Sequence, residues 1–268
     1  QKFLEIYDSS NWVFESVPSQ NRSMRKFVFK PIDISSFARE YLFRLGETVV
    51  MMSATILDYK TFCNSLGIKD SEVSFISLPS PFPVNNRPII AAPIGRMNMK
   101  EIDKTLPKLT QAVKEILENH KDEKGIIHCH TFKIANHLKN AIKDKRLIIH
   151  DSTNRDEKLL EHMNSKKPSV LLSPSMAEGV DLKGDFSRFQ IICKIPYPYL
   201  GDKIVKKRMH KWKRWYDLQT AKLIVQSAGR SVRSMEDTAV TYILDADWKR
   251  FYYKNSDILP EGFKKCIV

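Results

Sequence analysis

Three polar side chains near the carboxyl end of the sequence have a spacing that suits the binding of a polyphosphate. Gln226, Arg230 and Arg233 lie four and three residues apart, so on one continuous helix they would project from nearly the same face. Arginine is always charged, and its planar fork of donors matches phosphate oxygens. Gly229 would let another surface approach the backbone beside them. The same spacing also fits a surface helix with two solvated arginines, so both interpretations stay open.

The composition indicates a globular protein with an anionic partner. The sequence has 268 residues, 42% of them hydrophobic, and 44 lysines and arginines against 31 acidic residues give a net charge of +13. A surplus of that size favours nucleic acid or an anionic membrane surface. There is no apolar run long enough to span a membrane and no leader with a basic and then an apolar stretch. We therefore expect an intracellular protein, cytoplasmic in a prokaryote and nuclear in a eukaryote, with no membrane partner.

The cysteines and histidines do not have the spacing of a metal site. The four cysteines stand far apart without a C-x-x-C pair; they are Cys63, Cys129, Cys193 and Cys266. His128 and His130 flank Cys129, but on a strand the two histidines share one face and the cysteine points to the other. We expect no metal ligands in this sequence.

Apolar runs alternate with amphipathic stretches along most of the sequence. The runs are Ile126-Ile127, Leu147–Ile149, Val170–Leu172, Phe189–Cys193 and Ala239–Leu244. Because these runs are almost continuously apolar, they are typical of strands buried on both faces. The sequence therefore predicts an α/β fold, with a parallel sheet flanked by helices on both faces.

We expect two regions. Residues 1–48 form a less regular N-terminal segment with a helix over 36–45, and they lead into a lobe that covers residues 49–268. The lobe opens with a buried strand at Thr48–Met52, followed by Ser53 and Thr55 and then by a helix over 58–66. Ligands of open α/β sheets bind at the carboxyl ends of strands, which gives the two hydroxyls functional interest. The alternative is that one of them caps the helix.

Four segments, taken in order, resemble the third to sixth motifs of superfamily 2 helicases. They are Ser53-Ala-Thr55, Gly125–Thr131, Leu172–Leu182 and Gln226–Arg233. Within that superfamily the sequence is most similar to the XPD and DinG group of DNA helicases, because of Ser80-Pro-Phe82, the Glu-Gly-Val-Asp-Leu form of the fifth motif and Ile195-Pro-Tyr-Pro198. The resemblance covers about residues 28–250, and the ordered set is more specific than any one motif.

The resemblance implies a second RecA-like helicase lobe and a role for each motif. Arg230 and Arg233 would reach the γ-phosphate of ATP bound between two lobes, and Gln226 would contact the same phosphate. A loop that couples nucleotide state to the grip on DNA would contain Glu178, Gly179 and Asp181. The residues that couple hydrolysis to lobe movement would be Ser53 and Thr55. The hydroxyls that hold backbone phosphates of single-stranded or forked DNA would be Thr131 and Ser173.

One part of the full family pattern is missing from this sequence. It contains no G-x-x-x-x-G-K-[ST] segment and no Asp-Glu pair after an apolar strand. We therefore expect ATP and Mg²⁺ to be held mainly by a first RecA-like lobe of the same protein, and this chain alone to be inactive. Any iron–sulfur cluster of the family would also be held by that other part, so its presence stays unknown.

A basic cluster interleaved with aromatic residues is a second candidate for binding single-stranded DNA. Its cations include Lys207, Arg208 and Lys211, and a weaker cluster lies around Arg25. The helical spacing of Met209, Trp212 and Tyr216 favours a buried stripe beneath solvated lysines, which could still follow a DNA strand.

Two other functions remain open. An RNA helicase lobe of the DEAH type would share the spacing of Gln226, Arg230 and Arg233, but it would have an arginine at position 227 and a glycine at position 232. This sequence has Ser227 and Val232 there. The chain could also be a nucleic-acid-binding module without catalysis. Polarity of movement, 5′-to-3′, is implied by the resemblance alone.

Overall fold

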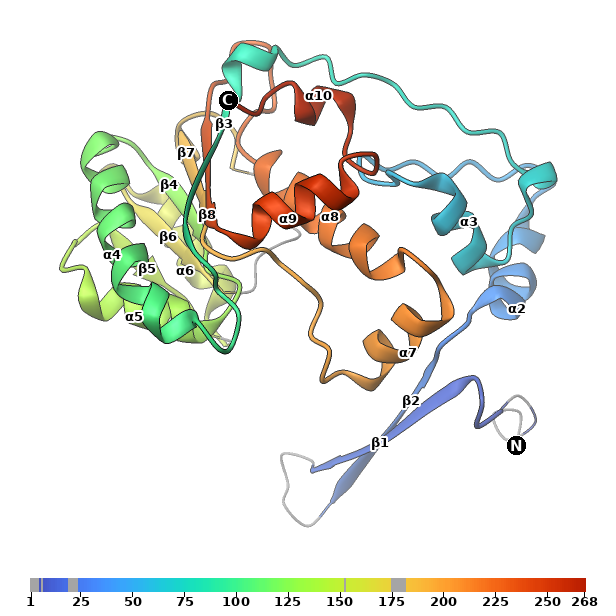
Figure 1. Ribbon diagram of the computed structural model, residues 1–268. Coiled ribbons are helices and arrows are strands. Elements are labelled where there is room, and N and C mark those ends of the chain that lie inside the picture. The colour runs from blue at the N-terminus through green and yellow to red at the C-terminus, as the bar shows by residue number, and fades with distance from the viewer. Residues whose placement is uncertain (1–4, 6, 19–23, 152, 175–181) are drawn as a thin grey trace. The chain divides into compact units, whose positions relative to one another are not determined.

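A computed structural model describes residues 5, 7–18, 24–151, 153–174 and 182–268 of the chain (Figure 1). The chain divides into two compact units. One consists of Gln1–Ser77 and Tyr197–Thr220, and the other consists of Leu78–Pro196 and Ala221–Val268. The sequence placed its boundary after residue 48, whereas in the structure residues 49–77 cluster with the first unit.

The second unit is built on a six-stranded sheet in which every neighbouring pair is parallel. The strand order is β3-β8-β7-β4-β6-β5. The bounds, in that order, are Ile89–Gly95, Val240–Asp245, Phe189–Ile192, Gly125–His128, Val170–Ser173 and Leu147–Ile149. All residues of β4, β6 and β7 are buried, as continuous apolar runs predict for central parallel strands.

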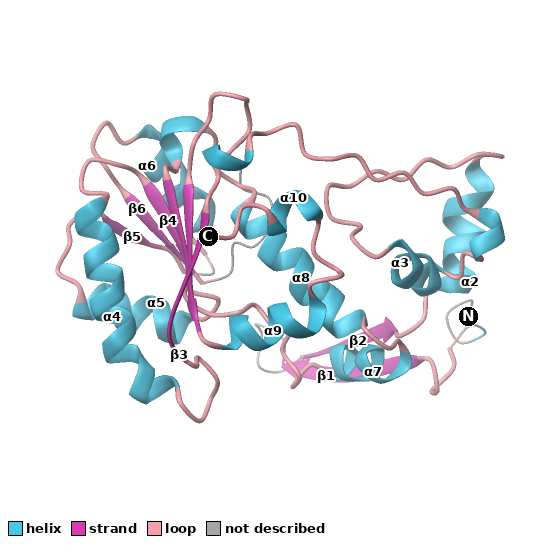
Figure 2. Cartoon of the chain, turned by 45° about the horizontal axis from the view of Figure 1, so that its top comes forward, coloured by secondary structure: helices cyan, strands magenta, loops and turns pink. Residues whose placement is uncertain are grey.

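Helices cover both faces of this sheet (Figures 1 and 2). They are α4 (Ile102–Asn119), α5 (Phe132–Ala141), α6 (Arg155–Asn164), α8 (Trp215–Ala228), α9 (Asp247–Asn255) and α10 (Glu261–Lys264). Ile127 of β4 packs in one cluster with Val113 of α4 and Leu138 of α5. The adjacent Ile126 packs in another cluster, against Leu159 of α6. Successive side chains of a strand point to opposite faces, so the predicted α/β fold with helices on both faces is confirmed.

The described part of the first unit contains a hairpin and several short helical segments. Strands β1 (Trp12–Pro18) and β2 (Arg25–Pro31) are antiparallel, with Phe14 opposite Phe29. An irregular helical segment follows, made of α2 (Ser35–Phe37), a π-helical turn (Ala38–Leu42) and a 3₁₀ turn (Phe43–Leu45). The other helices are α3 (Tyr59–Leu66) and α7 (Lys203–Lys211). The hairpin was missed in the sequence, and the helix expected over 36–45 is present in this irregular form.

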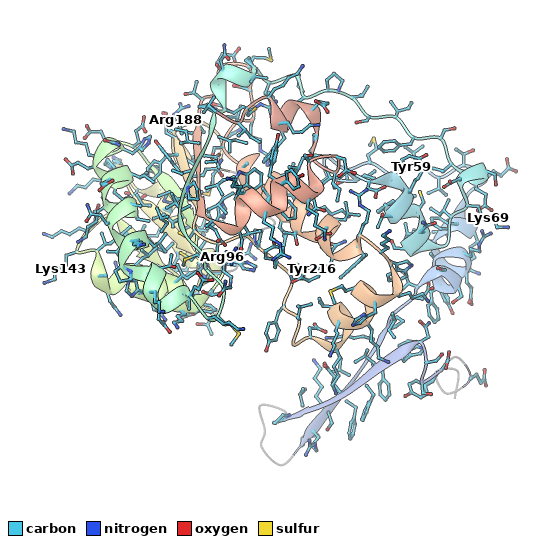
Figure 3. All side chains as sticks on the ribbon, viewed as in Figure 1. Tyr59, Lys69, Arg96, Lys143, Arg188 and Tyr216 are labelled. Atoms are coloured by element: carbon cyan, nitrogen blue, oxygen red, sulfur yellow. The ribbon has the colours of Figure 1, made fainter. Side chains whose placement is uncertain are left out.

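Helix α3 begins and ends as its sequence dictates. The side chain of Asp58 accepts hydrogen bonds from the N–H groups of Lys60 and Thr61, so Asp58 caps the helix, and neither Ser53 nor Thr55 does. Gly67 ends the helix in the left-handed region at φ 69°. The ring of Tyr59 stacks on Phe75 with centroids 4.9 Å apart (Figure 3).

The strand predicted at Thr48–Met52 is wrong for this chain. The structure has no strand there, and the side chains of Val50 and Met52 are 78% and 89% exposed. A strand requires a neighbour for its backbone N–H and C=O groups, and among the described residues none pairs with this segment. An apolar sequence with high strand propensity therefore forms no strand and stays mostly exposed.

Gly125 offers a test of the packing between β4 and β7. A Cβ at position 125 would lie 2.5 Å from ring carbons of Phe189, in the buried centre of the sheet. We expect Gly125→Ala to lower the free energy of unfolding by about 1–3 kcal/mol, because the ring has to shift within a close-packed core. Chemical denaturation of the purified chain measures this. Gly46→Ala is the matched control, because its Cβ would meet only the carbonyl of Thr48 at 3.4 Å; an equal loss in both variants would contradict the packing argument.

Candidate functional site

Two of the sequence-predicted hydroxyls lie at the carboxyl edge of neighbouring strands. Ser173 ends β6 and pairs with His128, which ends β4, and the N–H of Cys129 donates to the carbonyl of Ser173 at 2.9 Å. Thr131 follows β4 and caps α5, where its hydroxyl accepts the N–H of Ile134 at 3.3 Å. Thr131 is half-buried, whereas Ser173 is buried. The fold thus brings both residues to the edge where ligands of parallel sheets bind.

The helix that precedes the two arginines is shorter than the spacing predicted. Helix α8 ends at Ala228, so Gln226 is on the helix, whereas Arg230 and Arg233 follow it in a loop. The prediction that all three share one helical face is therefore wrong. Glycine has the lowest helix propensity after proline, so Gly229 terminates α8.

Side chains from the sheet fix the course of this loop. The amide of Gln190 in β7 donates to the carbonyl of Ala228 at 3.0 Å and to the hydroxyl of Thr241 in β8 at 3.3 Å. The hydroxyl of Ser231 donates to that of Ser187 at 2.8 Å, and both residues are buried. Gln190 therefore caps the carboxyl end of α8 from within the sheet. Its sequence signal was a polar residue inside an apolar strand, which we had not singled out.

The two arginines have different surroundings. Arg230 is 4% exposed, whereas Arg233 lies on the surface. The carboxylate of Asp237 accepts the backbone N–H groups of Arg233 and Ser234, at 3.0 and 3.1 Å. Arg230 is thus set into the interior of the second unit, and the backbone at Arg233 is held by a turn that leaves its side chain exposed.

His128 lies in the electrostatic field of Arg230. Burial lowers the pKa of His128 from 6.5 to about 3; the charge of Arg230 acts in the same direction, and a hydrogen bond with Gln190 opposes it. The imidazole is therefore neutral at physiological pH. A neutral ring adds no second positive charge beside the buried guanidinium.

Asp245 connects three loops at the same end of the sheet. It ends β8 and is 1% exposed, and its carboxylate accepts N–H groups of Met97, Ile195 and Asp247 at 3.3, 2.9 and 3.0 Å. Burial raises the pKa of Asp245, although these three hydrogen bonds act in the opposite direction. Asp245 was also missed in the sequence; its signal was a carboxylate directly after an apolar run.

The other residues predicted to contact the nucleotide or to couple hydrolysis to movement are not among the described residues of the second unit. Glu178, Gly179 and Asp181 lie outside the described residues. In the first unit, the hydroxyls of Ser53 and Thr55 lie 3.3 Å apart, and the N–H of Thr55 donates to Ser53 Oγ at 3.2 Å. The side chains of Ser53 and Thr55 therefore hydrogen-bond to each other's residue within a local turn.

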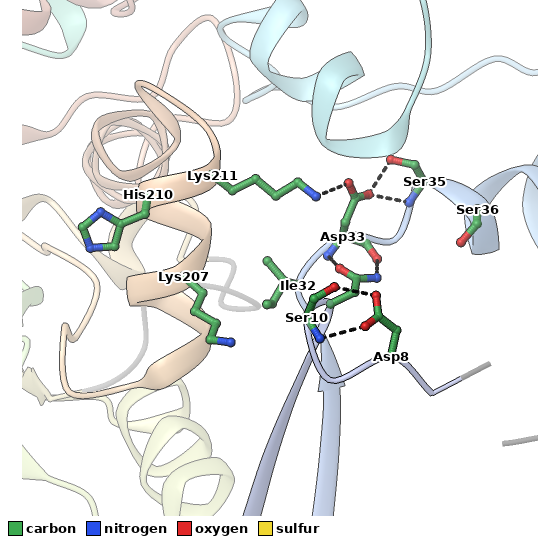
Figure 4. Close-up of a pocket in the computed structure, with 10 residues that line it drawn as sticks. Asp8, Ser10, Ile32, Asp33, Ser35, Ser36, Lys207, His210 and Lys211 are labelled. Atoms are coloured by element: carbon green, nitrogen blue, oxygen red, sulfur yellow. Dashed lines mark hydrogen bonds and ion pairs between the residues drawn. The ribbon is translucent and has the colours of Figure 1, made fainter. Parts of the chain in front are cut away.

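The basic cluster of α7 is partly engaged within the first unit (Figure 4). Arg208 donates from Nε to the carbonyl of Ile32 at 3.0 Å and from Nη2 to that of Pro31 at 3.1 Å. Lys211 forms an ion pair with Asp33 at 2.6 Å. Together they fasten α7 to the end of β2. Lys207 is exposed, and together with Asp33 and Lys211 it lines an open cavity of about 710 Å³.

The aromatic residues around α7 do not form the continuous buried stripe that helical spacing allowed. Helix α7 ends at Lys211, Trp212 is extended, and both Trp212 and Tyr216 are half-buried. The hydroxyl of Tyr216 donates to the carbonyl of Pro198 at 2.9 Å. The ammonium of Lys211 lies 5.5 Å from the ring centroid of Trp212, within range of a cation–π contact.

The described residues contain no group of three or more His, Cys, Asp or Glu side chains arranged to hold a metal ion. Across the same part of the chain, no helix combines the length and apolarity required to cross a membrane.

Comparison with known proteins identifies the class. Residues 113–262, more than half of the chain, match the family described as the helicase C-terminal domain. The chain belongs to this family. Together with the relatives and structures described next, this match makes it a C-terminal lobe of the XPD/DinG-like group of superfamily 2 helicases, as the ordered motifs predicted.

Two relatives illustrate the extent of the likeness. A protein named Probable ATP-dependent helicase, from Methanocaldococcus jannaschii, is 27% identical over 274 residues, which cover 91% of this chain and 41% of that protein. ATP-dependent DNA helicase DinG of Photobacterium profundum is 24% identical over 259 residues, which cover 88% of this chain and 37% of the relative. The chain therefore spans less than half the length of either protein.

Solved structures show the same fold. A structure of apo XPD superposes with a TM-score of 0.67 at 17% sequence identity, covering 88% of this chain and 52% of that one. Xpd4 of S. tokodaii superposes with a TM-score of 0.55 at 13% identity, covering 99% of this chain and 62% of that one. The sheet of the second unit is thus RecA-like.

The buried histidine gives the stability of the chain a defined pH dependence. In the unfolded chain His128 binds a proton below about pH 6.5, whereas the folded state resists protonation down to about pH 3. Stability is therefore lost as the pH falls through this window, by up to about 1.4 kcal/mol per pH unit. Burial lowers the pKa of His162 as well, which acts in the same direction.

We expect His128→Gln to flatten this pH dependence, because glutamine cannot take up a proton. The measurement is the thermal unfolding midpoint at about pH 7 and about pH 5. His210→Gln is the control, because it makes the same replacement at an exposed position of α7. A midpoint of His128→Gln that falls as steeply as that of the unsubstituted chain would contradict the assignment of a buried neutral imidazole.

Proposed function

We propose that this chain is the second motor lobe of an ATP-dependent DNA helicase, and that it supplies arginines to ATP bound between two RecA-like lobes. The observation that carries the proposal is the fixed loop after α8. Gln190 holds the last carbonyl of the helix, Ser231 is anchored in the sheet, and Asp237 fixes the turn at Arg233. Cationic donors held in place before reaction suit the charge that develops during phosphoryl transfer.

The two arginines divide this work. The guanidinium of Arg233 is exposed and can reach a ligand outside the unit, whereas Arg230 is buried beside a neutral imidazole. Both arginines suit the binding of ATP, because the guanidinium fork matches phosphate oxygens. Bound ATP with Mg²⁺ would supply the phosphoryl group, held mainly by the first lobe. Gln226, on the last turn of α8, would contact the same phosphate, and Glu178, Gly179 and Asp181 would couple nucleotide state to the grip on DNA.

For DNA, we propose contacts from both units to backbone phosphates. Thr131 and Ser173 lie at the carboxyl edge of β4 and β6, where Thr131 is the more accessible. On α7, Arg208 and Lys211 hold the helix in place and so position the exposed Lys207 for a phosphate. Hydroxyl and ammonium contacts of this kind hold a strand without reading its sequence. The 5′-to-3′ polarity and the preference for single-stranded or forked DNA rest on the likeness to the XPD/DinG group.

A first RecA-like lobe of the same protein is the proposed covering of the exposed apolar segment before Ser53. Val49, Val50 and Met52 are 41%, 78% and 89% exposed. Exposed apolar side chains in this number mark a surface that another body covers. Because Ser53 and Thr55 follow this segment directly, they would sense movement between the lobes.

The alternatives lead to different results with RNA. A DEAH-type lobe would respond to single-stranded RNA, and a non-catalytic module would bind nucleic acid without ATP hydrolysis. Ser227 and Val232 differ from the DEAH pattern, which favours the DNA helicase.

Arg233→Ala in the intact protein, with its first lobe, should reduce ATP hydrolysis stimulated by single-stranded DNA by about a thousandfold or more, because a phosphate-facing arginine is removed. Arg233→Lys should recover little, since an ammonium cannot replace the fork. Steady-state phosphate release measures this. Arg250→Ala, on the exposed surface of α9, is the control and should keep full turnover. Full turnover of Arg233→Ala would refute the assigned role, and stimulation by RNA in place of DNA would favour the DEAH alternative.

The isolated chain should hydrolyse no measurable ATP, because its sequence has no G-x-x-x-x-G-K-[ST] segment to cradle the phosphates. The measurement is phosphate release with and without single-stranded DNA. Recovery of hydrolysis on addition of the first lobe would support the division of the site between lobes. Robust hydrolysis by the chain alone would overturn it.

A further inference from the structure

The hairpin of the first unit carries aromatic rings along one face. The register places Phe14 opposite Phe29 and Ser16 opposite Phe27, so the three rings project from the same side of the two strands. The ring centroids of Phe14 and Phe29 lie 5.0 Å apart, and those of Phe14 and Phe27 lie 5.8 Å apart at an interplanar angle of 22°. We call these three residues the aromatic face.

This face is turned toward solvent. Phe14, Phe27 and Phe29 are 45%, 60% and 38% exposed, whereas Val13, on the opposite side of β1, is 4% exposed. Amphipathic hairpins normally bury their larger apolar side chains and expose the polar ones. Exposing three rings costs hydrophobic stabilisation, and such a patch on a soluble unit marks a binding surface.

A cationic side chain borders the aromatic face. Arg25 projects from the same side, where its Nε donates to the hydroxyl of Ser16 at 2.7 Å, which leaves the rest of the guanidinium available. Lys26, the next residue of β2, is also exposed but projects from the opposite side of the strand. Within the described part of the chain, no carboxylate pairs with Arg25 or Lys26, whereas Lys30 lies 3.7 Å from Glu15. Rings that can stack, bordered by a guanidinium that can hold a phosphate, match a single nucleic acid strand better than an apolar protein surface.

We propose that the aromatic face binds unpaired bases of single-stranded DNA by stacking, while Arg25 holds an adjoining phosphate. This inference rests on the proposed helicase function and adds to it a base-contacting site that is separate from the strand-end hydroxyls. Stacking on Phe14 and Phe27 requires no particular base, because every base has a flat π-face. The site would therefore grip DNA of any sequence.

The test compares a normal oligonucleotide with an abasic one that has the same phosphates. In the intact protein, Phe27→Leu keeps an apolar side chain but removes the ring. We expect it to weaken binding of a fluorescent oligothymidylate by about tenfold. It should leave binding of the abasic oligonucleotide unchanged, so that the preference for bases shrinks. Phe27→Trp should keep or strengthen the preference, and fluorescence anisotropy measures the affinity of each of the three proteins for both oligonucleotides.

Tyr253→Leu removes a ring on α9 that is even more exposed than Phe27, at 90% against 60%, and should change neither affinity. An undiminished preference for bases in Phe27→Leu, with Phe27→Trp also unchanged, would overturn the site. If Phe27→Leu changes the sedimentation coefficient of the protein, another protein molecule covers the aromatic face. That result would also overturn the proposed DNA site. The proposed function is judged separately, because loss of ATP hydrolysis in Arg233→Ala does not depend on Phe27. If the unsubstituted protein binds no single-stranded DNA, both proposals fail.

Discussion

A parallel sheet that is buried on both faces can offer polar side chains to a ligand only where its strands end. In the second unit this constraint decides the position of the two predicted hydroxyls. Ile126 and Ile127 of β4 pack into the core clusters on opposite faces of the sheet. The polar side chains of this segment therefore occur only from His128, the last residue of β4, to Thr131. Ser173 occupies the corresponding end of β6. The sheet thus gathers residues from distant parts of the chain along one edge.

Buried polar side chains inside the sheet hold the loops beside this edge in place. They do so because each buried donor and acceptor needs a hydrogen-bond partner. Gln190 meets this need by donating to the carbonyl of Ala228, which fixes where α8 ends. Asp245 does so by accepting three backbone N–H groups from separate loops. The positions of the loops that carry Arg230 and Ile195 therefore follow from hydrogen-bond satisfaction within the core.

The fold class and the ordered motifs could be predicted from sequence because hydrophobic periodicity is local, and each motif lies within one segment. The predicted sheet is therefore confirmed, as is the helix that Asp58 caps. What failed depended on tertiary context. Thr48–Met52 has strand propensity but no strand to pair with in the described chain, and the spacing of Arg230 and Arg233 gave no sign that Gly229 would end α8. Gln190 and Asp245 were missed because the hydrogen bonds that give them a role join segments far apart in sequence.

The loop after α8 also shows why the two departures from the DEAH pattern belong together. Ser227 and Val232 are 4% and 3% exposed, so both positions lie in the interior of the loop and its helix. An arginine at position 227 would require a buried charge to find a counter-charge or a large rearrangement. A glycine at position 232 would remove a buried apolar side chain and leave a cavity beside Arg233. The small residue at 227 and the apolar residue at 232 thus allow this packing of the loop, and they keep Arg230 buried while Arg233 faces outward.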